Sequence, residues 1–114
     1  MVAAGTGPRP ARGDVYLVAL DPTLGSEIQK TRPCLVVSPD ELNRHLRTAI
    51  VAPMTTAGRP YPWRVPCRFQ GRDGRVALDQ LRTVDRARLV RREGALAGAE
   101  VAAVLARLGE LFAP

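Results

Sequence analysis

The chain has 114 residues, the length of one ordinary domain, and 46% of them are hydrophobic, which excludes a wholly disordered protein. No run of about 18 apolar residues is present, which argues against a membrane span, and the first residues lack the apolar segment of a signal peptide. We therefore expect a cytoplasmic protein. The formal net charge is +6, and 16 of the 17 basic residues are arginine. This charge favours a polyanionic partner, although a GC-rich genome is an alternative source of the arginines.

The first half of the chain predicts two strands separated by a long polar loop. Residues 1–12 are rich in Gly, Pro and Ala and predict a flexible N-terminal arm before a single domain over 13–114. The loop over 21–32 is too long for a tight hairpin, which makes it a candidate functional loop. The predicted elements are a strand over 15–20, a buried strand over 33–37 and a short helix over 39–46.

The second half predicts more short strands and a terminal helix. Pro53 lies inside one predicted strand and suggests a strand end or a bulge. Residues 71–74 predict a turn, with Asp73-Gly74 as the hairpin-type signal. The predicted elements are strands over 48–54, 63–68, 76–81 and 89–94, a polar loop over 55–60, a helical turn over 85–88 and an amphipathic helix over 101–112. Together they predict a mainly β fold, a small bent sheet or barrel closed by a helix.

Several kinds of chemistry find no support in the residues available. His45 is the only histidine, so a pair of histidines acting as acid and base within one chain is excluded. No glycine-rich phosphate loop follows a strand, and no cluster of His, Cys or carboxylates has metal-site spacing, so we expect neither a metal nor a cofactor. Cys34 and Cys67 predict buried thiols, although the sequence leaves a disulfide between them open.

Polar side chains stand at the ends of several predicted strands. Arg32 precedes the strand over 33–37, and Thr55 follows the strand over 48–54. Glu27 lies in the long first loop, and Asp79 lies in the strand over 76–81. Strand ends converge on one rim of a small barrel, so we expect these groups to meet. A guanidinium, a hydroxyl and a carboxylate suit metal-free attack of an RNA 2′-OH on its neighbouring phosphate, which leaves a 2′,3′-cyclic phosphate and a 5′-OH.

Structural roles remain open for the same residues. Arg32 is equally suited to an ion pair with Glu27 or Asp79, and Thr55 is suited to satisfying backbone groups of its loop. Asp79 is suited to bonding loop amides. Trp63 suits either packing or the stacking of bases. The apolar stripe of the terminal helix suits either the core alone or the core and a dimer seam.

Five stretches of the chain, in this order, resemble the MazF/PemK toxins, the ribonuclease halves of bacterial toxin–antitoxin pairs. They are 13-GDVYLVALDPTLGSE-27, 32-RPCLVVSP-39, 51-VAPMTT-56, 61-YPWRV-65 and 72-RDGRVALDQLRTVD-85. The resemblance implies an SH3-like barrel of the CcdB/PemK type with helices, assembled as a homodimer. It implies metal-independent, sequence-specific cleavage of single-stranded RNA, mostly messenger RNA. It also implies a MazE-like antitoxin whose acidic, disordered tail blocks the RNA groove.

The resemblance also assigns roles to residues. The family's catalytic arginine falls on Arg32, its threonine on Thr55, and the acidic residue of its first loop on Glu27. PemK-like members use an arginine two positions before Asp79 and a histidine in the first loop. This chain has Ala77 and no histidine in those places, which favours the mechanism based on Arg32 and Thr55. The residues we predict to bind RNA are Lys30, Thr56, Arg59, Trp63, Asp79, Gln80 and Arg82.

Two other functions compete with this interpretation. Barrels of the CcdB type trap DNA gyrase and cleave nothing, but they lack the Arg-Pro pair at 32–33 and the Thr-Thr pair at 55–56 that this chain keeps. The second alternative is a nucleic-acid-binding barrel without catalysis, for example a DNA autorepressor, whose binding would be sensitive to salt.

Overall fold

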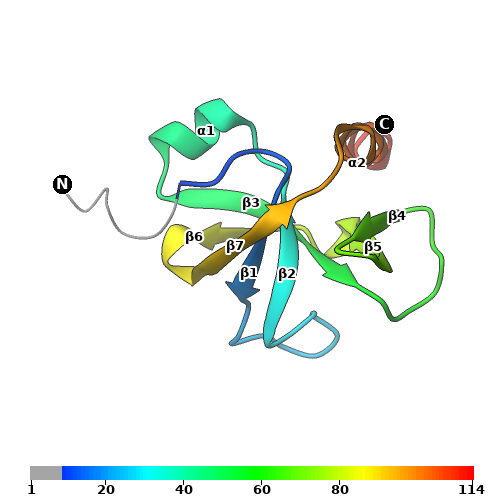
Figure 1. Cartoon of the computed structure of the whole chain (residues 1–114). Coiled ribbons are helices and arrows are strands. Elements are labelled where there is room, and N and C mark those ends of the chain that lie inside the picture. The colour runs from blue at the N-terminus through cyan, green and yellow to red at the C-terminus, as the bar shows by residue number, and fades with distance from the viewer. Residues whose placement is uncertain (1–8) are drawn as a thin grey trace.

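Residues 9–114 are described by the computed structural model, which consists of short strands with two helices at the top of the view (Figure 1). The first eight residues of the predicted arm lie outside the described residues. The strands are β1 (Asp14–Ala19), β2 (Thr31–Val36), β3 (Thr48–Thr55), β4 (Arg64–Phe69), β5 (Arg72–Ala77), β6 (Arg82–Asp85) and β7 (Leu89–Ala95). The helices are α1 (Asp40–His45) and α2 (Gly98–Leu111), and two 3₁₀ turns cover Leu78–Gln80 and Arg86–Arg88.

The strands form a mainly antiparallel sheet in the order β4-β5-β3-β2-β1-β7, with β6 paired to β3 outside this path. The short helix α1 follows β2, and α2 ends the chain. The prediction of a mainly β fold with a short helix and a C-terminal helix is confirmed. None of the described helices is long and apolar enough to cross a membrane.

Strand β2 is buried on both faces of the sheet. Leu35 and Val37 belong to one apolar cluster, and Cys34 and Val36 belong to the other. A strand covered on both sides reads as an uninterrupted apolar run, which is why the sequence predicted it as a buried strand. The strand begins at Thr31 instead of residue 33, so Arg32 lies within β2 and not before it.

Strand β3 changes partner along its length. Its first residues pair with β6, its middle with β2, and Met54 and Thr55 pair with β5. Pro53 pairs with Cys34 and the strand continues to Thr55, so the predicted strand end at Pro53 is wrong. This proline instead stands where β3 leaves β2 for β5, and its missing N–H removes one ladder donor at that point.

The hairpin between β4 and β5 turns earlier than predicted. Phe69 pairs with Arg72, which leaves Gln70 and Gly71 as the two turn residues, both with positive φ. Two-residue hairpins favour turns with positive φ, because these match the twist of the strands. Asp73-Gly74 lies inside β5, so the predicted hairpin signal at that dipeptide is wrong.

The predicted strand over 76–81 is also wrong beyond its first two residues. Strand β5 ends at Ala77, and the backbone then forms the 3₁₀ turn Leu78–Gln80. Val76, Ala77 and Leu78 are all buried in succession, which the alternating faces of one straight strand on a one-sided sheet do not provide. The turn places Leu78 in the core, whereas Asp79 is exposed and Gln80 is half-buried.

The terminal helix packs on the core along part of its predicted stripe. Val104 is fully buried, and Val101 and Leu108 pack against the same cluster. At the helix end, Leu111 and Phe112 are 42% and 71% exposed. The beginning of the stripe therefore belongs to the core, and its end remains an uncovered apolar surface.

A buried polar pair fixes α1 to the sheet. The Ser38 hydroxyl donates to Asn43 Oδ1 at 2.6 Å, and Asn43 Nδ2 donates to the Ser38 carbonyl at 3.0 Å. The Ile50 N–H donates to the same hydroxyl at 3.0 Å, which ties the helix to β3. Every polar atom of this pair is thereby satisfied in a place that water does not reach.

We predict that Asn43→Ala lowers the free energy of unfolding by about 2 kcal/mol, because the buried Ser38 groups lose their partners. Urea denaturation of the two proteins measures the difference. The matched control is Arg44→Ala in the same helix, where the exposed side chain should matter by less than about 0.5 kcal/mol. Equal effects of both substitutions would contradict the role of the buried pair.

Candidate active site

Arg32 and Thr55 line the same groove, whose volume is about 400 Å³. The groove lies between the start of β2, the end of β3 and the β4–β5 hairpin. The pairing of β2 with β3 ends at Cys34 and Pro53, so Arg32 and Thr55 each lie two residues beyond the last paired position of their strands. Two residues that are 23 positions apart in the sequence (55 − 32) therefore face one space.

The guanidinium of Arg32 is held on one edge. Its Nε donates to the carbonyl of Gln29 at 3.2 Å, and the side chain is exposed. This bond leaves both terminal nitrogens available, and such a fork matches two oxygens of a phosphate. Neither Glu27 nor Asp79 forms an ion pair with Arg32 among the described residues, so the proposed structural ion pairs are not present.

The Thr55 hydroxyl bonds within its own loop, and the Thr55 backbone lies beside a glycine. Thr55 Oγ1 accepts from the Ala57 N–H at 3.1 Å, which leaves the hydroxyl proton available to donate. A Cβ on Gly74 would lie 3.2 Å from the Thr55 carbonyl oxygen, which is tighter than ordinary packing. The absence of a side chain at Gly74 thus permits the close approach of β5 to Thr55 at the groove. Thr56 lines the same groove.

The two acidic residues that line the groove are each paired with an arginine. Asp73 accepts from Arg68 at 2.8 Å, and Glu93 accepts from Arg91 at 2.6 Å. Arg32 and Arg72 also line the groove, and no ion pair is found for either among the described residues. The local balance is therefore positive, as the binding of a phosphate backbone requires.

Glu27 and Lys30 lie in the β1–β2 loop, outside the lining of this groove. The Glu27 carboxylate accepts from the Leu24 N–H at 2.6 Å and closes a turn within the loop. Lys30 has a φ of 71°, an uncommon conformation for a residue with a side chain, directly before β2. The structure does not bring Glu27 to Arg32 and Thr55.

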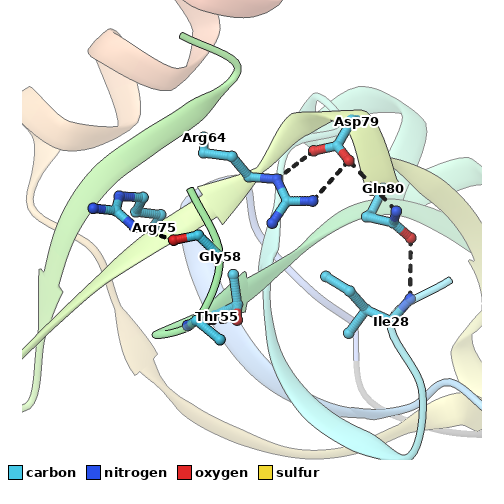
Figure 2. Close-up of polar contacts among 8 residues, drawn as sticks. Ile28, Thr55, Gly58, Arg64, Arg75, Asp79 and Gln80 are labelled. Atoms are coloured by element: carbon cyan, nitrogen blue, oxygen red, sulfur yellow. Dashed lines mark hydrogen bonds and ion pairs between the residues drawn. The ribbon is translucent and has the colours of Figure 1, made fainter. Parts of the chain in front are cut away.

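Asp79 and Gln80 belong to a second polar cluster (Figure 2). Arg64 clamps the Asp79 carboxylate with two bonds, from Nε at 2.6 Å and from Nη2 at 2.8 Å. Gln80 Nε2 donates to Asp79 Oδ2 at 3.4 Å, and its Oε1 accepts from the Ile28 N–H at 3.1 Å. The hydrogen bonds from Arg64 hold the pKa of Asp79 below its usual value, because they favour the charged carboxylate.

The other predicted RNA-binding residues are dispersed around these two clusters. Arg82 donates to the Leu20 carbonyl at 3.1 Å, and Arg59 lies exposed in the loop between β3 and β4. The ring of Trp63 stacks on that of Tyr61, with centroids 4.8 Å apart and planes 9° from parallel. Both rings are partly exposed, so the stack offers an aromatic face beside the loop.

The two cysteines are buried and not bonded to each other, which confirms the prediction of buried thiols and not the alternative of a disulfide. Burial raises the pKa of the Cys34 thiol to about 12 and that of Cys67 to about 11. Both thiols are therefore protonated at neutral pH, and the thiolate that acts as a nucleophile is not populated. Among residues 9–114, no group of three His, Cys, Asp or Glu side chains is placed to hold a metal ion.

Sequence reasoning missed Arg64, Arg72 and Arg75. The alternation of Arg64 with the buried Val65 already indicated that its side chain points outward from β4. Its partner Asp79 was placed in a strand, and only the 3₁₀ turn brings that carboxylate to Arg64. Arg75 donates to the Gly58 carbonyl at 3.2 Å and fastens the β3–β4 loop (Figure 2).

Comparison with known proteins gives a consistent set of similarities. Residues 11–112 match the family of PemK-like, MazF-like toxins of type II toxin–antitoxin systems. The chain is 35% identical over 104 residues to the endoribonuclease toxin MazF of Escherichia coli K12, covering 90% of this chain and 94% of that protein.

The fold of the chain is also similar to those of solved structures of this family. The crystal structure of MazF from Deinococcus radiodurans superposes with a TM-score of 0.80 at 28% identity, over 91% of this chain and 96% of that one. A mycobacterial endoribonuclease, solved in complex with its cognate antitoxin, superposes with a TM-score of 0.77 at 26% identity. That match covers 92% of this chain and 97% of the mycobacterial chain.

We predict that the Arg64–Asp79 pair makes the free energy of unfolding fall as the pH is lowered into the acid range. The pKa of Asp79 is lowered in the folded state, so the unfolded chain binds its proton first as the pH falls. The stabilising contribution is complete above the usual value of 3.8 and is lost as the pH falls through the lowered pKa. The contribution should be about 1 kcal/mol or less, because the pair is partly exposed.

Urea unfolding of the wild type and of Asp79→Asn, at pH 6 and at pH 3, measures this contribution. The difference in unfolding free energy between the two proteins should shrink at the lower pH, since at pH 3 the unfolded chain already binds a proton at Asp79 and folding of the wild type must release it. A difference that stays constant between the two pH values would contradict the assignment.

Proposed function

This chain belongs to the PemK-like, MazF-like toxins of type II toxin–antitoxin systems, and on that basis we propose that it is an endoribonuclease that cuts single-stranded RNA. The observation that carries the proposal is the placement of Arg32 and Thr55 on one groove. A cation and a hydroxyl at the same concave surface are the groups that a phosphodiester requires. Messenger RNA is the substrate class that the family resemblance favours.

The proposed reaction is an internal transesterification. The 2′-oxygen of one ribose attacks the adjacent phosphorus and forms a new P–O bond, while the bond from phosphorus to the 5′-oxygen breaks. The 2′-hydroxyl proton leaves and the 5′-oxygen gains a proton, so atoms balance without added water. The products are a 2′,3′-cyclic phosphate and a 5′-hydroxyl. The task of the protein is to hold the in-line geometry and stabilise the charge of the phosphorane.

We assign the charge-stabilising role to Arg32. Its terminal nitrogens are available in the groove, and its position in the rigid β2 strand preorganises them. Thr55 is assigned to orienting the 2′-hydroxyl or a phosphate oxygen, since its own proton remains available. Glu27 is proposed as the third catalytic residue. It is an exposed carboxylate of the loop that leads into β2, and in this role it exchanges its bond to Leu24 for a substrate group.

RNA contacts are proposed along the surface that surrounds the groove. The stacked rings of Tyr61 and Trp63 are suited to a flanking base, because stacking on an aromatic face tolerates any base. The exposed cations Lys30 and Arg59 are suited to the phosphate backbone. The remaining proposed contacts are Thr56, Asp79 and Arg82; Gln80 is not among them, because both ends of its amide already bond within the protein.

We further propose the assembly that the family resemblance implies. The sheet is proposed to be an SH3-like barrel, and two copies to form a homodimer in the cytoplasm. The neutralising partner is proposed to be a MazE-like antitoxin, since MazF of Deinococcus radiodurans was solved in complex with MazE. An acidic, disordered tail suits a chain with a net charge of +6, because opposite charges steer association.

The proposal is tested by incubating the purified protein with a long mixed RNA and mapping the new 5′-hydroxyl ends. Discrete ends at a recurring short sequence support a sequence-specific endoribonuclease. Intact RNA under conditions in which the protein is folded would refute the proposal.

We predict that Arg32→Ala lowers the cleavage rate by about 10²–10³-fold, because one preorganised charge stabiliser is removed. The fold should be unaffected, since the side chain is exposed and bonds only one carbonyl. Single-turnover cleavage of the RNA measures the rate, and circular dichroism checks the fold. The control Arg44→Ala removes an exposed arginine from α1 and should cleave like the wild type. Wild-type rates for Arg32→Ala would remove Arg32 from the mechanism.

We predict that cleavage persists in EDTA. The proposed reaction uses a hydroxyl of the substrate as nucleophile and a guanidinium for charge, so chelation removes nothing that it requires. Rates with and without EDTA should agree within twofold at constant ionic strength, since RNA binding is itself sensitive to salt. Loss of activity on chelation, with recovery on adding Mg²⁺ or Mn²⁺, would refute the metal-free scheme.

A further inference from the structure

The β1–β2 loop carries Glu27 and leads into Arg32, so its conformation decides where both side chains stand. At the neck of the loop, the Leu20 N–H donates to the Lys30 carbonyl at 2.9 Å. Lys30 adopts the left-handed conformation, which turns the chain sharply into β2. A polar, exposed loop of this length does not hold one conformation through local contacts alone, so side chains from elsewhere must fix it.

Two arginines fix the first end of the loop. Arg88 donates from Nη1 to the carbonyls of Ala19 at 3.0 Å and Asp21 at 2.7 Å. Arg82 donates from Nη1 to the Leu20 carbonyl at 3.1 Å. Three successive carbonyls at the end of β1 are thus held by charged donors from the segment over 82–88.

Gln80 fixes the second end of the loop. Its Oε1 accepts from the Ile28 N–H at 3.1 Å, a contact between residues 52 positions apart (Figure 2). The other end of the same amide, Nε2, faces Asp79 Oδ2 at 3.4 Å. An ionised carboxylate only accepts hydrogen bonds, so the Gln80 nitrogen must point to Asp79 and the oxygen to Ile28. The bidentate clamp of Arg64 holds that carboxylate still.

The backbone that Gln80 holds also receives the side chain of Arg32. The residue after Ile28 is Gln29, and its carbonyl accepts from Arg32 Nε at 3.2 Å. A continuous series of contacts therefore runs from Arg64 through Asp79 and Gln80 to the loop backbone, and from there to the guanidinium in the groove. Each contact in the series is a hydrogen bond with a defined donor and acceptor.

From this series we infer that Gln80 is a positioning residue, which fixes Ile28 and Gln29 and thereby aims the guanidinium of Arg32. The inference rests on the proposed ribonuclease function and deepens it. Both polar ends of the Gln80 amide are engaged within the protein, so a contact from Gln80 to RNA would require breaking one of them. A direct RNA contact by Gln80 is the competing role, and the two roles differ in what the loss of the amide does to RNA binding.

Two variants test the acceptor of Gln80 in different ways. Gln80→Leu removes the acceptor for the Ile28 N–H, and Gln80→Glu keeps an acceptor oxygen while losing the donor to Asp79. A misplaced catalytic group commonly costs one to two orders of magnitude, so Gln80→Leu should slow single-turnover cleavage by about 10–100-fold. Gln80→Glu should be slowed as well, because its carboxylate lies beside the ionised Asp79 and the repulsion between like charges displaces the acceptor from the Ile28 N–H.

RNA affinity, the additivity of Gln80→Leu with Arg32→Ala, and hydrogen exchange at Ile28 distinguish a positioning role from a general loss of stability. The affinity for an RNA with a 2′-deoxy ribose at the cleavage position should stay within twofold in Gln80→Leu. In the Arg32→Ala background, adding Gln80→Leu should cost less than it does in the wild type, because one of the side chains that the loop positions is gone. Amide hydrogen exchange at Ile28 should accelerate in Gln80→Leu, which follows the lost bond independently of activity.

Several results would overturn the inference. They are an unchanged cleavage rate in Gln80→Leu, a loss of RNA affinity that matches the loss of rate, and full additivity with Arg32→Ala. If Gln80→Leu does not fold, Gln80→Met takes its place, since it has similar length and also lacks the acceptor. A wild-type protein that leaves RNA intact would refute the proposed function, whereas active wild type with an equally active Gln80→Leu would refute only the positioning role.

Discussion

Strand β2 is buried on both of its faces over Cys34, Leu35 and Val36, and this burial fixes the position of its exposed first half, which carries Arg32. Cys34 and Val36 pack into one apolar cluster while Leu35 and Val37 pack into the other. A one-residue slip of the register would exchange the two sets and place Arg32 on the wrong face. Each fully buried Val or Leu contributes about 1.5–3 kcal/mol, so the position of this strand is strongly determined. The guanidinium is exposed, but the strand that carries it is rigid.

Strand β3 links β2 to the β4–β5 hairpin, and the groove lies between these elements. The strand is paired to β2 through its middle and to β5 at its end, so Thr55 is carried away from β2 and toward the hairpin. The divergence of β3 from β2 opens the groove, and Pro53 stands at the point of divergence. Gly74 lets the β5 backbone approach Thr55 closely. A groove between diverging strands keeps its shape without a ligand, which is the preorganisation that charge stabilisation needs.

The arginines of this chain divide into those that hold the protein and those that face the solvent in the groove. Arg64 donates its hydrogen bonds to the Asp79 carboxylate, and Arg82 and Arg88 donate theirs to backbone carbonyls of the β1–β2 segment. Arg32 keeps two terminal nitrogens for an anion. The net charge of +6 therefore overstates the number of cations available to a polyanion. The further pair Arg68–Asp73 shows the same use of charge, since it cancels an acidic group of the groove.

The sequence by itself determined the elements whose signal is local or periodic. The apolar run of β2, the short helix after it and the helical stripe that ends the chain were all predicted, and the family motifs marked Arg32 and Thr55. Only the tertiary structure decided where β5 stops, that Gln70 and Gly71 form its turn, and that Asp79 meets Arg64. These features depend on which strand pairs with which and on burial from both sides. Contacts between residues 52 positions apart, as from Gln80 to Ile28, leave no trace in local composition, because the fold and not the neighbouring sequence supplies the partner.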